Sequence, residues 1–85
     1  MPEVYVASHV REELQQRPAE LRDRVKSKLR DASERPDRHL RSLTEREEHS
    51  LRIGDYRAII DWRKSEEALY VVAFGHRRSV YDRGL

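Results

Sequence analysis

The sequence predicts an α+β fold in the order β-α-α-β-β-β, with two N-terminal helices packed on one face of an antiparallel four-stranded sheet. Two patterns support this prediction. In the N-terminal half, apolar residues recur at helical spacing, whereas from residue 47 onward apolar and polar residues alternate as in strands. Short polar turns separate the alternating segments, which favours an antiparallel meander.

The size and composition of the chain limit what it can be. Its 85 residues suffice for one hydrophobic core, so residues 1–85 are predicted to form a single domain. Cysteine is absent, which excludes disulfides and thiolate metal sites and indicates a cytoplasmic protein. The N-terminus lacks the long apolar run of a signal peptide or a membrane span. Charged residues make up 40% of the chain, but the net charge is only +2, which is weak evidence for nucleic-acid binding.

The N-terminal half is predicted to hold one strand and two helices. β-branched and aromatic residues alternate over residues 3–7, as in a strand. Ser8 is a suitable N-cap for a following helix. Pro18 interrupts that helix and suits the first turn of the next one, which Pro36 ends. The apolar stripe of this second helix consists of Leu21, Val25, Leu29 and Ala32.

Three strands are predicted after a connecting loop at residues 37–44. Their sequences are EHSLRI, YRAIIDWR and ALYVVAFG, separated by a turn at Gly54-Asp55 and by a polar turn at residues 64–67. We take the second turn to close Lys64 against Ala68. The facing pairs are then Trp62–Tyr70, Ile60–Val72 and Ala58–Phe74. This face is wholly apolar and is predicted to carry the helices.

The opposite face of the same strands gathers arginines at one end. In this register Arg57 faces Gly75, and Arg77 lies diagonally beside Arg57. Gly75 has no side chain and leaves an opening between two guanidinium groups, which repel each other unless an anion lies between them. Their fork geometry suits phosphate. Arg52, on the preceding strand, is expected to be a third contributor.

This cluster suits RNA cleavage without a metal ion or other cofactor. Attack by a 2′-hydroxyl needs a proton acceptor, stabilisation of charge on the phosphorane, and a proton donor for the leaving oxygen. Arginines supply the second need, and Tyr81 lies within reach for a proton-transfer role. His76 is a further candidate for proton transfer, but its alternation with Phe74 places it on the helix side, where a structural role is the competing interpretation. Arg78 is a further phosphate contact if the last strand ends there, and the histidines show no metal-ligand spacing.

The stretches LRIGDYRAIIDW and VVAFGHRRSVYDR, together with the chain length and element order, resemble the RelE-type toxins of the RelE/ParE superfamily. The resemblance covers essentially the whole chain and implies a curved sheet. It also implies a toxin of a type II toxin–antitoxin system that acts as an mRNA interferase. Such toxins are RNA-binding endoribonucleases that enter the ribosomal A site, cleave the codon and inhibit translation. The implied partners are a cognate antitoxin, the ribosome and messenger RNA.

The resemblance also assigns roles to individual residues. The catalytic set is Arg57, which stabilises the phosphate, Arg77 at the end of the last strand, and Tyr81, which stacks on a base or aids proton transfer. Arg52, Arg78 and His76 are the expected RNA contacts. Relatives often carry a basic residue where this chain has Ser50, so either Arg52 or His49 takes its place, and the general base is unassigned.

Two other functions remain open at this stage. ParE-type members of the superfamily poison DNA gyrase by protein contact and cleave no RNA, and a plain nucleic-acid-binding module is the third reading. The paired arginines and the C-terminal tyrosine favour the RelE type. The floor of the open face is predicted to consist of Ile59, Leu69, Val71 and Ala73. Because such an apolar floor is unusual in solvent, part of an antitoxin is expected to cover it.

Overall fold

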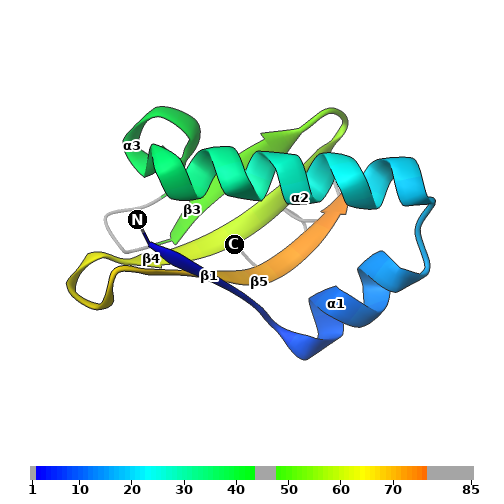
Figure 1. Ribbon diagram of the computed structural model, residues 1–85, viewed down its shortest axis with the longest axis horizontal. Helices are drawn as coiled ribbons and strands as arrows, with labels where there is room; N and C mark the ends of the chain where they lie inside the picture. Colours follow the sequence, from blue (N-terminus) through cyan, green and yellow to red (C-terminus); the bar gives the residue numbers. More distant parts are fainter. Residues whose placement is uncertain (1, 44–47, 77–85) are drawn as a thin grey trace.

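The computed structural model describes residues 2–43 and 48–76 of the chain. In chain order its elements are β1 (Glu3–Val6), α1 (Ser8–Gln15), α2 (Ala19–Glu34), α3 (Pro36–His39), β2 (Arg41–Ser42), β3 (Glu48–Ile53), β4 (Tyr56–Arg63), a 3₁₀ turn (Lys64–Glu66) and β5 (Ala68–His76). The strands form one sheet in the order β1-β5-β4-β3-β2. The N-terminal helices pack on one side of it, and α2 runs across the strands (Figure 1). The predicted α+β fold is confirmed.

The sheet differs from the predicted one in two respects. First, β1 runs parallel to β5. A parallel neighbour requires a crossover connection, which α1 and α2 help to provide. Second, the segment predicted as a loop at residues 37–44 holds α3 and β2, and β2 pairs antiparallel to β3. The described sheet is therefore mixed and five-stranded instead of antiparallel and four-stranded.

Helix α2 buries most of the predicted stripe. Val25, Leu29 and Ala32 are buried against the sheet, and Leu21 packs at the margin of the core. The predicted cap by Ser8 is wrong, because Ser8 is already helical and Ala7, with an extended ψ of 147°, is the N-cap without a side-chain hydrogen bond. No helix in the described ranges is both long and apolar enough to cross a membrane.

The pairing of β4 with β5 changes register at one point. Near the arginines, Arg57 faces Gly75 and Ile59 faces Ala73, as predicted. Beyond a bulge between Ile59 and Ile60 the pairing slips by one residue. The observed pairs there are Ile60–Val71, Asp61–Tyr70, Trp62–Leu69 and Arg63–Ala68. The predicted pairs Trp62–Tyr70 and Ile60–Val72 are therefore wrong.

The slip originates in the turn between the strands. Arg63, not Lys64, closes against Ala68, so the loop holds one residue more than predicted. Glu67 ends the 3₁₀ turn in the left-handed region, with φ 50° and ψ 50°. β5 then inserts one extra residue, Val72, as a bulge. The extra loop residue and the extra strand residue offset one another, which is why the arginine end keeps the predicted register.

The bulge decides which side chains face the helices. Leu69 and Val71 are 0% and 2% exposed and belong to the core, so the prediction that they floor the open face is wrong. Tyr70, predicted to face the helices, lies on the other side and stacks on Tyr5 with ring centroids 5.1 Å apart. One apolar position predicted for the open face, Ile59, is itself buried. The face that the helices leave uncovered is therefore mostly polar and aromatic.

Candidate nucleic-acid interface

Arginines gather at one end of the sheet face that the helices leave uncovered, which we call the open face. Arg52 of β3 lies directly opposite Arg57 of β4, and Arg57 lies opposite Gly75 of β5. Directly opposite residues on neighbouring strands have Cβ atoms about 5 Å apart, and like charges in this position destabilise a sheet. An anion bound between the two guanidinium groups removes that repulsion.

Arg57 has an unmet hydrogen-bonding need. Its side chain is half-buried, and its Nη1 is buried without a hydrogen-bond partner among the residues that the structure describes. A buried donor without an acceptor costs about 1–3 kcal/mol, and more when the group is charged. Because a guanidinium stays protonated in proteins, loss of a proton cannot relieve this cost. An oxygen atom of a bound anion can accept this hydrogen bond and so relieve the cost.

Arg63 lies on the same side of β4 and is in the opposite situation. Its Nε lies 3.1 Å from Asp61 Oδ2, and its Nη1 lies 3.4 Å from Glu66 Oε2. The hydrogen bonds to Asp61 and then to Glu66 raise the pKa of Arg63. Its guanidinium also lies over the ring of Tyr70, 5.0 Å from the centroid. The charge at this end of the strand is thus neutralised by the protein itself, which leaves the Arg57 end for an external anion.

Carboxylates surround the two tyrosines beside Arg63. The Tyr5 hydroxyl donates to Glu3 Oε2 at 2.6 Å, and the Tyr70 hydroxyl donates to Glu66 Oε1 at 3.2 Å. The hydrogen bond to Glu3 raises the pKa of Tyr5, whereas partial desolvation followed by the hydrogen bond to Glu66 raises the pKa of Tyr70. The acidic setting makes this end of the open face unfavourable for a phosphate.

The structure separates His76 from Arg57. His76 ends β5 opposite Tyr56, with the two rings edge-on and their centroids 6.0 Å apart. Since Tyr56 alternates with Arg57 along β4, His76 lies on the helix side, as its alternation with Phe74 indicated. The structure therefore does not bring the predicted RNA contact His76 next to Arg57. Arg77, Arg78 and Tyr81 lie outside the described residues.

The side chains of β3 show which residue can take the place of the basic residue that relatives carry at the position of Ser50. His49 faces the helix side, edge-on to Trp62 at a centroid distance of 5.3 Å. Ser50, which stands where relatives carry the basic residue, is buried opposite Ile59. Of the two candidates to replace it, Arg52 alone shares the open face with Arg57. Within residues 2–43 and 48–76 no group of His, Asp and Glu side chains is placed to hold a metal ion.

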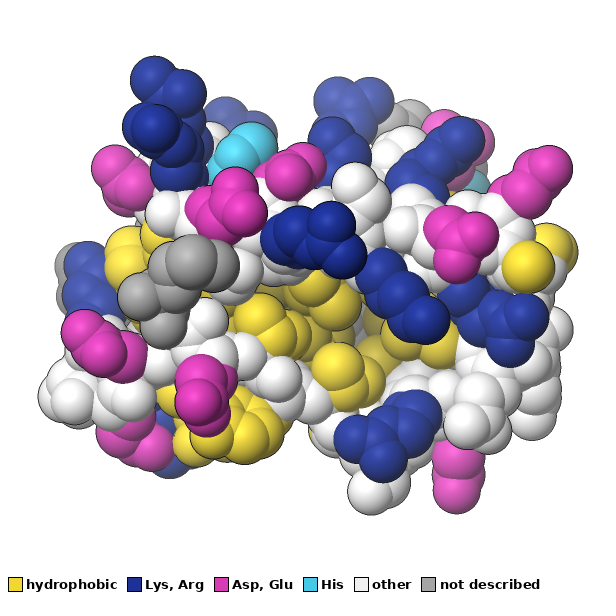
Figure 2. Space-filling model, in the orientation of Figure 1, with side chains coloured by type: hydrophobic (Ala, Val, Ile, Leu, Met, Phe, Trp, Pro, Cys, Tyr) yellow, Lys and Arg dark blue, Asp and Glu magenta, His cyan; other side chains and the backbone are white. Residues whose placement is uncertain are grey.

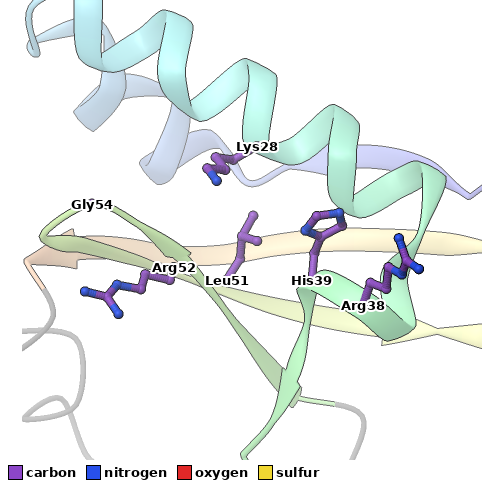
Figure 3. A pocket seen from close by; sticks show the side chains of 6 residues that line it. All are labelled: Lys28, Arg38, His39, Leu51, Arg52 and Gly54. Carbon is purple, nitrogen blue, oxygen red and sulfur yellow. The ribbon is translucent and has the colours of Figure 1, made fainter.

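A second basic site was missed by the sequence analysis. A cavity of about 310 Å³ lies where α2, α3 and β3 meet, and Figure 3 shows the six residues that line it. The lining consists of Lys28, Arg38, His39, Leu51, Arg52 and Gly54. The sequence does place Lys28 four residues after Arg24, on one face of the helix. It does not indicate that this face lies over the β3–β4 turn.

The fold and the arginine cluster together define a small α+β protein suited to a polyanionic ligand, and three solved structures share the fold. The isolated Escherichia coli RelE toxin aligns over 100% of both chains with a TM-score of 0.76 at 14% identity. The intact E. coli RelBE toxin–antitoxin complex aligns with a TM-score of 0.74 at 16% sequence identity. The alignment covers 89% of this chain and 96% of that chain. The RelB–RelE complex of Methanococcus jannaschii aligns with a TM-score of 0.69 at 20% sequence identity, over 95% of this chain and 99% of that chain. At these identities the likeness shows the fold alone.

The sequence itself shows the family. Residues 7–81 match the family described as the ParE toxin of type II toxin-antitoxin system, parDE. The chain therefore belongs to the ParE toxin family, and it is a toxin of a type II toxin–antitoxin system with a RelE-like structure. No curated protein sequence matches the chain. The predicted membership of the RelE/ParE superfamily is confirmed.

Proposed function

We propose that this toxin is a ribosome-dependent endoribonuclease that cleaves messenger RNA in the ribosomal A site and thereby inhibits translation. The observation that carries the proposal is the pair Arg52–Arg57, in which a buried guanidinium nitrogen of Arg57 has no partner within the described part of the chain. A phosphodiester offers the acceptor oxygens that this nitrogen needs. The RelE-like fold adds support.

In the proposed reaction the ribose 2′-oxygen forms a bond to phosphorus, and the bond from phosphorus to the 5′ oxygen breaks. The 2′-hydroxyl gives its proton to a base, and the 5′ oxygen takes up a proton. The products are a 2′,3′-cyclic phosphate and a 5′-hydroxyl. Arg57 and Arg52 stabilise the negative charge that grows on the non-bridging oxygens of the phosphorane.

Three of the remaining roles are predictions on residues outside the described ranges. Arg77 completes the phosphate fork with Arg57, and Tyr81 stacks on a base or carries a proton. Arg78 contacts the RNA backbone. His76, on the helix side of β5, reaches the RNA only where the strand ends.

The test is primer extension on a reporter messenger in a translating extract. We expect codon-phased cleavage by the wild type and a loss of at least about 100-fold in Arg57→Ala and Arg77→Ala. Arg63→Ala is the matched control, because Arg63 lies on the same side of β4 but is paired with carboxylates. Codon-phased cleavage that persists in Arg57→Ala would contradict the proposed role.

The family match supports a second candidate function, since ParE-type toxins poison DNA gyrase. Purified gyrase in a supercoiling assay separates the two. Inhibited supercoiling without messenger cleavage would favour this candidate. Cleavage with unaffected supercoiling would favour the endoribonuclease.

We also propose a cognate antitoxin as a partner, docked between α1 and α2 instead of on the open face. The cavity there measures about 330 Å³; Val6, Leu14, Val25 and Leu29 form its apolar part, and Arg11, Arg22 and Lys26 its charged part. Figure 2 shows hydrophobic atoms in a hollow bordered by Lys and Arg side chains. This chemistry suits an acidic amphipathic segment. Hydrogen exchange is expected to slow in α1 and α2 when the antitoxin binds, and slowing confined to β3–β5 would contradict this placement.

A further inference from the structure

We propose that the cavity between α2, α3 and β3, here called the junction cavity, is a second RNA-binding site that holds a backbone phosphate away from the bond that is cleaved. The choice of RNA as the ligand rests on the proposed function. The cavity itself is defined by the geometry of side chains from three elements. Its ligand chemistry is that of a phosphodiester, whether from the messenger or from ribosomal RNA.

Side chains from the helices and from β3 line the junction cavity. Lys28 projects from α2 toward β3, and Leu51 of β3 points back toward it (Figure 3). Arg38 and His39 stand on one side of this pair, and Arg52 stands on the other (Figure 3). The short helix α3 begins with Pro36 directly after α2, which brings its basic last turn to the cavity.

A further cation lies at the same corner. Gly54 forms the β3–β4 turn with φ +61°, and a Cβ atom built on it would lie 3.2 Å from Arg24 Nη1. The guanidinium of Arg24 thus rests against the turn whose Gly54 lines the cavity. Arg24 and Lys28 are four residues apart and project from the same face of α2. The helix therefore supplies two positive charges to this corner.

The junction cavity lacks internal counter-charges. No carboxylate is among its lining residues, and in the described ranges the ion pairs found involve Arg17 and Arg63, not Lys28, Arg38 or Arg52. Lys28 is half-buried beside this cavity. Cations that converge without counterions raise the local potential and attract an anion.

The lining favours a nucleic-acid backbone over a protein segment. Leu51 is the one large apolar side chain in the lining, whereas the cavity between α1 and α2 has four. Protein partners need apolar or aromatic anchors at the centre of an interface. Phosphate contacts, in contrast, come from Arg and Lys side chains of the kind that line this cavity.

Arg52 links the junction cavity to the open face. It lines the cavity and also lies directly opposite Arg57 on the neighbouring strand. The basic residues therefore extend from α3, past Lys28, to the start of β4. A single RNA strand that crosses the end of β3 contacts both sites through consecutive phosphates.

The experiment measures RNA binding without cleavage. A short fluorescein-labelled RNA, 2′-O-methylated throughout so that it cannot react, is titrated by anisotropy at several salt concentrations. We expect Lys28→Gln and Arg38→Gln each to weaken binding roughly three- to tenfold and to lower the slope of log K against log salt by about 0.7 per lost phosphate contact. Arg30→Gln is the matched control, because Arg30 is an exposed residue of α2 outside the cavity. It is expected to leave both the affinity for RNA and the salt dependence unchanged.

A second arm uses sedimentation with ribosomes that carry no messenger. Loss of ribosome binding in Lys28→Gln with unchanged oligonucleotide binding assigns the phosphate to ribosomal RNA, and the reverse assigns it to the messenger. Equal behaviour of Lys28→Gln and Arg30→Gln in both arms overturns the site. So does reduced binding of poly-L-glutamate with unchanged RNA binding, since the cavity then serves an acidic protein.

These outcomes are independent of the cleavage assay. Codon-phased cleavage together with oligonucleotide binding and ribosome binding that are both insensitive to Lys28→Gln overturns the junction site alone. RNA binding that depends on Lys28 in a protein that cleaves nothing overturns the proposed reaction and leaves the site in place. Thermal unfolding by circular dichroism verifies that each variant is folded.

Discussion

His9 Nε2 lies 2.9 Å from the carbonyl oxygen of Val72, a hydrogen bond that joins α1 to the bulge in β5. A carbonyl oxygen only accepts, so the ring nitrogen is the donor. The bulge determines that Val71 faces the helices and that Val72 does not. The first helix is thus hydrogen-bonded to β5 at the point where the register between β4 and β5 changes.

Replacing His9 is expected to destabilise the fold. His9→Ala removes the donor to the Val72 carbonyl and should lower the free energy of unfolding by about 1 kcal/mol. Urea denaturation followed by circular dichroism measures the change. His39→Ala serves as the control, because His39 is exposed on α3 and should change the stability by less than about 0.5 kcal/mol. Equal effects would argue against a structural role for His9.

Two adjacent valines test the register. Val71→Ala leaves a cavity in the core and is expected to cost about 2 kcal/mol of unfolding free energy, because Val71 is 2% exposed. Val72→Ala, at the 37% exposed bulge, should cost no more than about 0.5 kcal/mol. Without the bulge, Val72 would face Ile60 inside the core. Val72→Ala would then cost more stability than Val71→Ala. Urea midpoints of the two variants decide between the registers.

Arg57 and Arg63 should respond in opposite ways to the same change. Arg57→Gln removes a charged group with a buried, unsatisfied nitrogen and is expected to leave stability unchanged or to raise it by about 1 kcal/mol. Arg63→Gln breaks two ion pairs at a largely exposed site and should lower the stability slightly or leave it unchanged. Urea denaturation measures the free energy of unfolding of both variants. Clear destabilisation by Arg57→Gln would mean that Nη1 has a partner in solution.

The ionisation of Tyr5 is expected to depend on Glu3. The hydrogen bond to this carboxylate and its negative charge raise the pKa of Tyr5 above 10.0, the ordinary value. The folded state holds the neutral phenol, so this contribution to stability is present below about pH 10 and is lost as pH rises through the raised pKa. Glu3→Gln should lower the pKa of Tyr5, as seen by NMR titration of labelled tyrosine rings. In the control variant Glu66→Gln, the pKa of Tyr70 should move more than that of Tyr5.

The turn between β4 and β5 offers a stabilising substitution. Glu67 has a left-handed backbone with φ 50°, which costs a residue with a Cβ atom about 1 kcal/mol. Glu67→Gly is therefore expected to raise the free energy of unfolding by about 0.5–1 kcal/mol. Ser65→Gly in the same turn is the control and should lower it, because Ser65 does not have a positive φ. A loss of stability in Glu67→Gly would argue against this turn geometry.

The alternation of side chains predicted the sheet only where it is strict. Around Arg57 the strands alternate without interruption, so the pairing with Gly75 could be deduced. Val72 lies within a continuous apolar run from Ala68 to Phe74, and no change of pattern marks the inserted residue. The register beyond Ile59 therefore depended on the turn and on the hydrogen bond from His9, neither of which the pattern reveals.

The basic site was predictable in part for a similar reason. Arg52 and Arg57 follow from strand register alone. The junction cavity depends on α3 and β2, which are four and two residues long and contain no periodic apolar pattern. Elements this short are stabilised by their neighbours, so their positions follow only from the packed structure. Arg38 was therefore predicted to lie in a connecting loop.

The strand order has a consequence for how the toxin is made. β5 lies between β1 and β4, although β1 is synthesised first and β5 after all the other described strands. Until β5 leaves the ribosome, β1 has no neighbour in the sheet, and Val10, Val25 and Leu29 lack their contacts with Leu69, Val71 and Phe74. The core therefore closes after translation of β5, and Arg57 meets Gly75 only then. The open face beside Arg57 is thus completed only after the last of the described strands has been synthesised.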